Sequence, residues 1–329
     1  MSRTEQLFAA VYEVPDDDSR RQVLADHLQE LGDPRGEFIA LQLAHASSPP
    51  SAAAQRREQQ LVEQHGPAWL GPLGGLAYEP RWARGFLDEV SVELPSTSAG
   101  HPMWSTVRRL RLISGVLDQR SSAGPLGAGC FRSLRALTGL GVARLEGLLA
   151  APVKPPLQSV QLLSSSTTTD RELALLQRLV ELPELRELEL ALFARLRGAQ
   201  DLDWLWTNPL AGRLERLALN LNMPFDPAGC LRAVGTRFPR LQRLGLIHNY
   251  FEFAFERGGD GRLSALTVSW NGAVNAASYL SQVAAPLRAL PDDALTSFRF
   301  VQGPKPFPQA KLQRVMKAVA RQKRLSSAS

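Results

Sequence analysis

Acidic residues crowd the stretch from residue 15 to residue 43, which reads PDDDSRRQVLADHLQELGDPRGEFIALQL. Carboxylates at this density can hold a divalent cation, form a general acid–base pair, or cap helices and pair with arginines on helix surfaces. A metal or acid–base site needs two or three carboxylates to converge on one point, and nothing in the spacing requires that. The choice among these uses depends on where the helices of this stretch begin and end.

The spacing of apolar residues predicts three helices in the N-terminal region. The first covers residues 5–14 and ends at a proline, the second covers residues 19–31, and the third begins at residue 34. The second helix has apolar side chains at helical spacing, which are expected to form its buried face: Val23, Leu24, Leu28 and Leu31.

Three of the acidic residues lie where these helices begin. Asp17 or Asp18 can cap the second helix. Asp33 can cap the third, where Pro34 would take the first helical position without losing a hydrogen bond. Gly32 is placed to end the second helix in the left-handed conformation. We therefore interpret these three carboxylates as helix caps.

The remaining acidic side chains are expected to form ion pairs. Asp26, Glu30 and Glu37 can pair with Arg21 and Arg35 along or between helices, and each pair would contribute about 0.3 kcal/mol. If these carboxylates instead turn outward together, they could form a metal-dependent or regulatory site, with the remainder of the chain reading the target. We favour capping and ion pairs and keep the acidic site as the alternative.

The same residues carry a resemblance to a known family. The stretch is similar to the bacterial repeat-companion domain, a short helical module with a pattern close to DDxxRxxxADxLxExGDPxGEFIxLQ, which residues 17–42 match. The resemblance covers residues 4–45, about an eighth of the chain. It implies a helical module over residues 1–45 that has no biochemical activity of its own and is followed by repeats.

The composition is that of a globular protein able to bury a large core, with 44% hydrophobic and 21% charged residues among 329. No apolar run approaches the length of a membrane helix and the start does not resemble a signal peptide, so we expect a soluble cytoplasmic protein. Cys130 and Cys230 lack Cys or His companions and the five histidines lack ligand spacing, so no metal or cofactor is expected. The net charge of +6 permits weak attraction to anionic partners without identifying one.

A repeating unit, LxxLxL, follows a Ser-, Pro- and Ala-rich connection and a short helix that together fill residues 46–83. The unit starts at residues 87, 107, 134, 157, 185, 214, 241, 263 and 295, so successive starts lie 20, 27, 23, 28, 29, 27, 22 and 32 residues apart. Nearly all of these spacings fall within the roughly 20–29 residues of leucine-rich repeats. Asn222, Asn249 and Asn271 occupy the ninth position of three units, where an amide can satisfy backbone groups at a bend.

The segments between the units have helical apolar spacing, so a period of 2 alternates with a period of 3.6. A bundle of leucine-rich helices would keep the longer period throughout. We therefore predict an α/β fold in which residues 84–303 resemble an irregular leucine-rich repeat solenoid, with a parallel β-sheet on the concave face and helices and loops on the convex face. Residues 304–329 form a basic amphipathic segment that is expected to cap the solenoid, and nucleic-acid binding by this segment is a weak alternative.

In such a solenoid the leucines point inward and the residues between them line the concave face. The charged residues expected to bind a partner there are Arg109, Arg111, Arg135, Arg186, Glu187, Glu189, Arg216 and Arg243. A patterned surface of this kind selects a partner by charge complementarity, although it can equally be a solvated sheet face. Tyr250, Phe251 and Phe253 follow the seventh unit and either fill the core or anchor a partner at the rim.

The sequence contains no nucleophile elbow, phosphate-binding loop or dinucleotide-binding fingerprint, and no cysteine with the surroundings of a catalytic nucleophile. Enzyme activity is therefore not expected. The sequence predicts a non-enzymatic scaffold or protein–protein interaction protein whose partner is a protein that the sequence does not identify.

Overall fold

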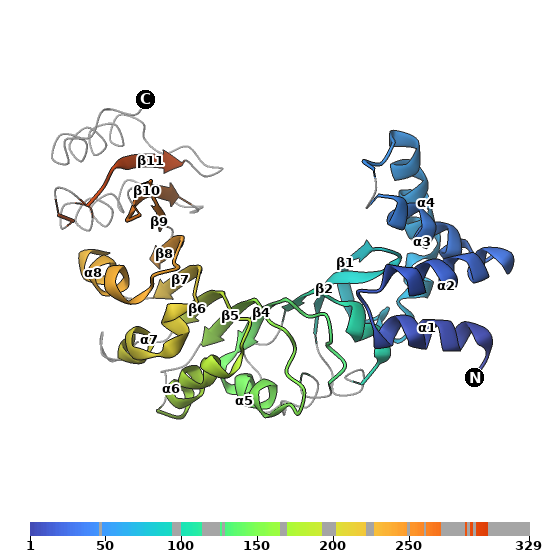
Figure 1. Ribbon diagram of the computed structural model, residues 1–329, viewed down its shortest axis with the longest axis horizontal. Helices are drawn as coiled ribbons and strands as arrows, with labels where there is room; N and C mark the ends of the chain where they lie inside the picture. The colour runs from blue at the N-terminus through green and yellow to red at the C-terminus, as the bar shows by residue number, and fades with distance from the viewer. Residues whose placement is uncertain are drawn as a thin grey trace. The chain divides into compact units, whose positions relative to one another are not determined.

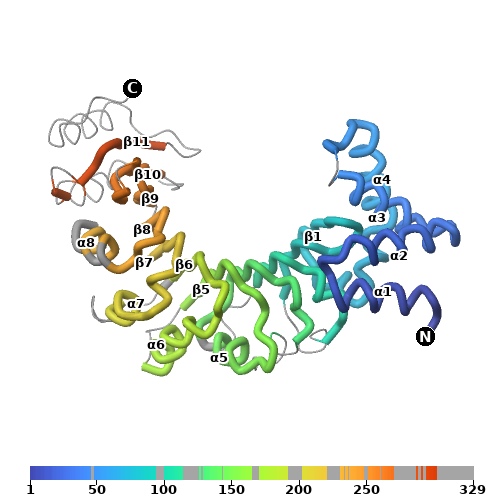
Figure 2. Tube along the Cα trace, viewed as in Figure 1, coloured from blue at the N-terminus to red at the C-terminus, as the bar shows by residue number. Residues whose placement is uncertain are grey.

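Figures 1 and 2 show the computed structural model, which describes residues 1–45, 48–93, 100–113, 126, 129–164, 170–192, 202–221, 227–248, 251–259, 261–270, 287, 290–291 and 294–301. Within these residues the protein is α/β, as predicted, with an N-terminal helical region and an open, mostly parallel sheet of 11 strands that follow one another in chain order. The chain divides into two compact units. Unit 1 comprises Met1–Gln158 and Leu182–Glu184, and unit 2 comprises Ser159–Glu181 and Leu185–Ser329.

Among the described residues, four helices form the start of unit 1, and the second and third of them begin after the aspartates that the sequence places at their caps. They are α1 (Arg3–Glu13), α2 (Asp18–Glu30), α3 (Pro34–Ala44) and α4 (Ala52–Trp69), followed by the 3-10 turn η1 (Gly71–Leu73). The Asp17 side chain accepts hydrogen bonds from the first backbone N–H groups of α2, and the Asp33 side chain does the same for α3. Gly32 has a φ of 70° after α2. The predicted caps at Asp17 and Asp33 and the predicted stop at Gly32 are confirmed.

The buried face of α2 differs from the predicted one. Leu24 and Leu28 are fully buried, but Val23 is 51% exposed and Leu31 is 63% exposed. The inward positions are residues 21, 24, 25 and 28, which keep helical spacing from Arg21 onward. The buried face of α2 therefore includes the charged residue Arg21 and excludes Val23 and Leu31, so the prediction for Val23 and Leu31 was wrong.

Two glycines allow elements of unit 1 to pack at very short range. A Cβ atom on Gly36 would lie 2.6 Å from the backbone nitrogen of Gln29 and 2.7 Å from the carbonyl oxygen of Ala25, so α3 packs directly on α2. A Cβ atom on Gly85 would collide with Ile39 of α3. Both positions therefore require glycine because the neighbouring element occupies the space of a side chain.

An antiparallel hairpin begins the sheet. Strand β1 (Ala77–Ala83) pairs with β2 (Phe86–Val92) through a two-residue turn in which Arg84 and Gly85 have φ values of 53° and 78°. Positive φ at both central residues is the geometry of a type I′ turn, which matches the twist of the two strands. Strand β1 is the edge strand, and Pro80 lies where its register with β2 is irregular, which makes this edge a poor template for another strand. Residues 46–83, predicted as a connection and a short helix, thus contain α4 and the first strand of the sheet.

The rest of unit 1 continues the sheet in parallel. Strands β3 (Arg109–Leu112) and β4 (Ala136–Gly141) follow β2 in register, with the 3-10 helix η3 (Pro102–Thr106) before β3 and the helix α5 (Val142–Ala150) after β4. Burial alternates along β3, where Leu110 and Leu112 are buried and the two arginines are exposed. One face of these strands is therefore core and the other is polar.

Among the residues of unit 2 that the structure describes there are seven strands, with helical segments between several of them. The strands are β5 (Ser159–Ser164), β6 (Glu187–Leu192), β7 (Arg216–Leu221), β8 (Arg243–His248), β9 (Phe251–Arg257), β10 (Leu263–Trp270) and β11 (Ser297–Val301). The helical segments are α6 (Asp170–Gln177), η4 (Arg178–Glu181), α7 (Asp203–Thr207), η6 (Pro209–Gly212) and α8 (Pro227–Arg237). Leucines at alternate positions of β6, β7 and β8 are almost completely buried, so the leucine pattern marks the inward face of these strands.

Strand β9 interrupts the parallel order. It pairs antiparallel with both β8 and β10, so the segment between the units at 241 and 263 is a strand rather than a helix. Phe251, Phe253 and Phe255 alternate along it and are all buried. The expectation of uniform parallel strands was wrong for this segment, and the FEFAF alternation is the sequence signal for it.

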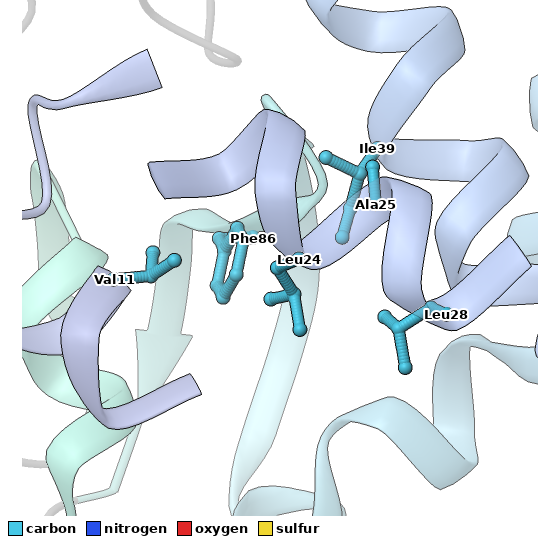
Figure 3. Packing of buried hydrophobic residues seen from close by; sticks show 6 residues of the cluster. All are labelled: Val11, Leu24, Ala25, Leu28, Ile39 and Phe86. Carbon is cyan, nitrogen blue, oxygen red and sulfur yellow. The ribbon is translucent and has the colours of Figure 1, made fainter. Parts of the chain in front are cut away.

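The helical region and the hairpin of unit 1 share one hydrophobic core. Phe86 of β2 is buried among Val11, Leu24, Ala25, Leu28 and Ile39 of the first three helices (Figure 3). A second cluster joins Phe38 of α3 to Leu61 and Trp69 of α4, with Trp82 of β1 packed against it. Since residues beyond 45 complete both clusters, the helices predicted as residues 1–45 are only part of this packed unit.

Candidate interaction surfaces

The acidic stretch connects the helices of unit 1 to the strands of the same unit. Asp16, in the turn between α1 and α2, lies 2.6 Å from Arg108 and 3.4 Å from Arg84 at its Oδ1, and its Oδ2 lies 3.9 Å from Arg135. Asp18 was expected to cap α2, but it lies in the first turn and its Oδ1 contacts Arg84 at 3.1 Å. Asp16 and Asp18 therefore contact arginines that lie 66 to 119 residues further along the chain.

Two buried arginines lie against aromatic rings in the shared core. The guanidinium carbon of Arg21 lies 5.2 Å from the ring centroid of Phe86, and that of Arg35 lies 5.1 Å from the same centroid and 4.8 Å from that of Phe8. Arg21 also forms an ion pair with Asp18 at 3.2 Å. Burial lowers the pKa of both guanidinium groups, that of Arg21 to about 10. Cation–π contacts thus take the place of the carboxylate partners that the sequence suggested for these arginines.

The other three carboxylates do not meet Arg21 or Arg35. Asp26 accepts a hydrogen bond from the Gln22 side chain at 2.8 Å, and Glu30 is exposed. Glu37 binds Arg57 of α4 through two contacts of 2.7 Å and 2.6 Å, and these hydrogen bonds lower the pKa of the Glu37 carboxyl. Among the residues that the structure describes, no group of three or more His, Cys, Asp or Glu side chains could hold a metal ion. The acidic stretch is therefore built from caps and separate contacts.

On the outward face of unit 1, the predicted arginines lie beside side chains of the neighbouring strands. Arg109 stands next to Glu89 in register and forms an ion pair with it. Arg111 is exposed at the next outward position of β3. Arg135, just before β4, contacts Glu184 at 3.0 Å. Two of the three predicted binding arginines of this unit are thus paired within the protein.

On the outward face of unit 2, charged residues form rows across the strands. One row runs in register through Glu187, Arg216, Arg243 and Glu256, from β6 to β9. Arg216 lies 3.4 Å from Glu187, and Arg243 lies 3.5 Å from Glu256 and 2.7 Å from Glu252. Each arginine of the row is therefore held by a glutamate of a neighbouring strand.

A second row contains mostly small side chains. It passes through Glu189, Ala218, Gly245 and Ala254, and Gln161 donates a hydrogen bond to Glu189 at 2.8 Å. Just before the strands, Arg186 and Glu215 form a further ion pair at 3.5 Å. The predicted residues Arg186, Glu187, Glu189, Arg216 and Arg243 are thus brought together on one face of this unit.

Two of the three aromatic residues that follow the seventh unit lie in the core. Phe251 and Phe253 are each 1% exposed, so of the two roles that the sequence leaves open they fill the core and do not anchor a partner at the rim. In an antiparallel strand with alternating glutamates, the aromatic side chains take the inward face and the glutamates take the outward face. Tyr250, the predicted asparagine ladder (Asn222, Asn249 and Asn271) and residues 304–329 lie outside the described residues.

Sequence reasoning missed one pocket because it assigned residues 46–83 to a connection. A pocket of about 540 Å³ lies between α3, α4 and the β1–β2 hairpin, lined in part by Glu58, Trp82 and Asp88. The signal for the hairpin was the pair Arg84–Gly85 between two short alternating segments, a pattern typical of a two-residue turn. Nothing local in the sequence places α4 opposite this hairpin.

No family model, curated protein or solved structure matches this chain. In the part of the chain that the structure describes, every helix is too short or too polar to cross a membrane. The assignment of a function therefore depends on the contacts, exposure and charge of the described residues.

Proposed function

We propose that this protein is a non-enzymatic interaction protein in which a leucine-rich repeat sheet binds a protein partner through the outward face of unit 2. The repeat interpretation is supported by the positions of the strands. Strands β5, β6, β7, β8 and β11 each begin two residues after the start of an LxxLxL unit. In this interpretation the first helices of unit 1 are a repeat-companion module that packs on the hairpin at the start of the sheet.

The observation that carries the proposal is the row of alternating charges on the outward face. The side chains of Arg216, Arg243 and Glu256 are 65%, 44% and 52% exposed although each lies in an ion pair. Each of these ion pairs therefore leaves part of the charged side chain exposed to solvent. A partner with complementary charges can therefore contact them without moving the strands.

The internal ion pairs suit a surface that selects its partner. Exposed pairs of this kind contribute about 0–1 kcal/mol, so a partner that replaces one of them loses little stability. Because the glutamates already hold the arginines in place, less side-chain freedom is lost when the partner binds. Complementary charges then determine which partner binds and how fast it associates.

Small residues stand in register beside this row, namely Ala218, Gly245 and Ala254 on three neighbouring strands. Gly245 and Ala254 are buried, whereas Ala218 is half-buried, so Ala218 is the residue of this set that a partner can reach.

Affinity purification with matched variants tests the proposal. The full-length protein and the double variant Arg216→Gln/Arg243→Gln would be used to recover partners from the organism that encodes the chain, with quantification by mass spectrometry. The control is Arg178→Gln, because Arg178 forms an exposed ion pair with Glu181 at 2.7 Å on the helical segment η4 rather than on the sheet. If each arginine contributes about 0.7 kcal/mol to the complex, the double variant recovers about tenfold less partner.

The comparison with the control decides the outcome. The proposal expects a protein that is lost with the double variant and retained with Arg178→Gln. Equal recovery with all three proteins would show that the outward face of unit 2 is not the binding surface.

A further inference from the structure

The pocket between α3, α4 and the β1–β2 hairpin belongs entirely to unit 1. Its volume of about 540 Å³ lies in the range of ligand-binding pockets, roughly 300–1,000 Å³. One wall is apolar and consists of Phe38, Val62 and Trp82. The rings of Phe38 and Trp82 meet edge to face with centroids 6.2 Å apart, which fixes the orientation of this wall.

The rest of the lining is largely acidic. Glu58, Glu63, Asp88 and Glu89 all line it, whereas Arg81 is the one basic residue in the described part of the lining. Two of these acids have partners that satisfy them. Glu63 accepts a hydrogen bond from Gln59 at 2.8 Å, and Glu89 forms its ion pair with Arg109. The remaining two, Glu58 and Asp88, determine what the pocket can bind.

Glu58 and Asp88 are mostly buried, and neither has a close lysine or arginine partner. Their side chains are 17% and 18% exposed. Oε1 of Glu58 lies 2.8 Å from His45 and its Oε2 accepts a hydrogen bond from Gln42 at 3.5 Å, whereas Oδ1 of Asp88 lies 3.9 Å from Nε of Arg108.

Burial and the neighbouring Glu89 raise the pKa of the Asp88 carboxyl and outweigh Arg109, Arg84 and Arg21, which lower it. A further cation placed in the pocket would favour the charged form of this carboxyl. The pocket thus offers carboxylates for a cation and an aromatic wall for an alkyl chain.

We propose that this pocket binds the basic side chain of an arginine or lysine that is presented by a protein partner. The alkyl part of the side chain would lie on Phe38 and Trp82, and its charged end would reach Glu58 and Asp88. A basic side chain of a protein is a ligand that brings both a cation and an alkyl chain. A metal ion fits less well, because no three potential ligand side chains among the described residues could hold one. This site is separate from the outward face of unit 2 and does not depend on its function.

Titration of the full-length protein with blocked peptides, followed by NMR, tests the site. The chain contains six tryptophans, and the indole resonance of Trp82 can be assigned with Trp82→Phe. The probe is a blocked Gly-Gly-Arg-Gly-Gly peptide, and its control replaces the arginine with citrulline, which has the same shape without the charge. We expect a saturable shift of the Trp82 resonance with arginine and about tenfold weaker binding of the citrulline peptide, since hydrogen bonds to charged groups are the stronger ones.

Variants of the pocket give the second part of the test. Asp88→Asn is expected to weaken binding of the arginine peptide about threefold to fivefold, as loss of one partly exposed charge pair predicts. Gln59→Lys, at an exposed position of the lining, puts an ammonium group beside the pocket and is expected to weaken binding by a similar factor even if Asp88→Asn does not fold. The matched control is Glu30→Gln, which removes an exposed carboxylate of α2 outside the lining and should leave affinity unchanged.

Several results would overturn the proposal. They are the absence of a saturable shift with the arginine peptide, equal affinity for the citrulline peptide, and affinities of the Asp88→Asn and Gln59→Lys variants that equal that of the wild type. A Trp82 shift caused by Mg²⁺ or Ca²⁺ but not by the arginine peptide would instead identify a metal site.

Discussion

Phe86 is the residue on which the packing of unit 1 depends most. Its side chain is 1% exposed and is surrounded by apolar residues of α1, α2 and α3 (Figure 3). It meets the rings of Phe8 and Tyr12 edge to face, with centroids 6.1 Å and 5.9 Å apart, and two guanidinium groups lie against it. Phe86→Ala removes all of these contacts from a strand that is distant in sequence from the helices.

The expected loss is about 4 kcal/mol. Replacing a buried phenylalanine with alanine costs roughly 3–5 kcal/mol in transfer and cavity free energy. Each cation–π contact adds about 0.5–2 kcal/mol, but these contributions overlap with the cavity term and are not summed in full. Since single domains are stable by about 5–15 kcal/mol, the variant should unfold at a much lower urea concentration.

Urea unfolding of the full-length protein, followed by tryptophan fluorescence and by circular dichroism, measures this loss. The control is Tyr78→Ala, which removes an aromatic side chain from the same hairpin at a position that is 49% exposed, and it should cost less than about 1 kcal/mol. If Phe86→Ala costs no more than Tyr78→Ala, the helices and the hairpin do not share a core and the reasoning fails.

Four further outcomes follow from contacts in unit 1. Gly36→Ala should destabilise unit 1 by more than about 2 kcal/mol, since its Cβ would lie within 2.7 Å of the α2 backbone; urea unfolding checks this, and a change below 0.5 kcal/mol contradicts it. Asp33→Ala should cost about 1 kcal/mol in the same assay through loss of the α3 cap, whereas Asp33→Asn should cost less. The folded-state pKa of Asp88 is raised, so the folded state binds the extra proton and this group's contribution to stability falls as pH rises from the model-peptide value of 3.8 through the raised pKa. The free energy of unfolding of the wild type minus that of Asp88→Asn should fall across that window, and parallel profiles of the two proteins would contradict this. Burial raises the pKa of the Cys130 thiol to about 11, so alkylation of Cys130 by iodoacetamide at pH 8 should be slower than that of an exposed thiol and should accelerate as pH rises toward 11; a rate equal to that of glutathione would contradict it.

Local signals in the sequence predicted the elements that depend on local contacts. Asp17, Gly32 and Asp33 fixed the ends of α2 and α3 because a cap acts on backbone groups within three residues of itself. The LxxLxL units located the inward leucines because alternation along a strand is a property of the strand alone. These parts of the fold needed no knowledge of distant residues.

Long-range contacts explain what the sequence left undetermined. Val23 was expected to be buried because it is apolar, but the packing partners of α2 lie on α1, α3 and β2, and they face Arg21 instead. The sequence did not indicate that Arg35 contacts aromatic rings, because Phe8 precedes it and Phe86 follows it at a distance in the chain. The partners of Asp16 likewise depend on how the strands of unit 1 are ordered.

The candidate surfaces show the same division. The leucine pattern predicted which positions of β6–β8 face outward. Glu187, Arg216 and Arg243 occupy such positions, and they stand in register on neighbouring strands. The leucine pattern did not reveal that Glu252 and Glu256 of β9 would pair with Arg243, because β9 runs antiparallel between β8 and β10. The pocket beside Trp82 is lined by residues of four elements within residues 34–92. No single sequence motif predicts that these elements pack together.

Site-directed photocross-linking tests the role of the outward face most directly. A photoreactive amino acid would replace Ala218, which lies on the outward face of β7 beside the charged row, and in a second protein it would replace Glu181 on the helical segment η4. The account predicts a covalent adduct with the same partner protein from position 218 and none from position 181. Adducts from position 181 alone, or equally from both positions, would contradict the claim that this protein binds its partner through the outward face of its sheet.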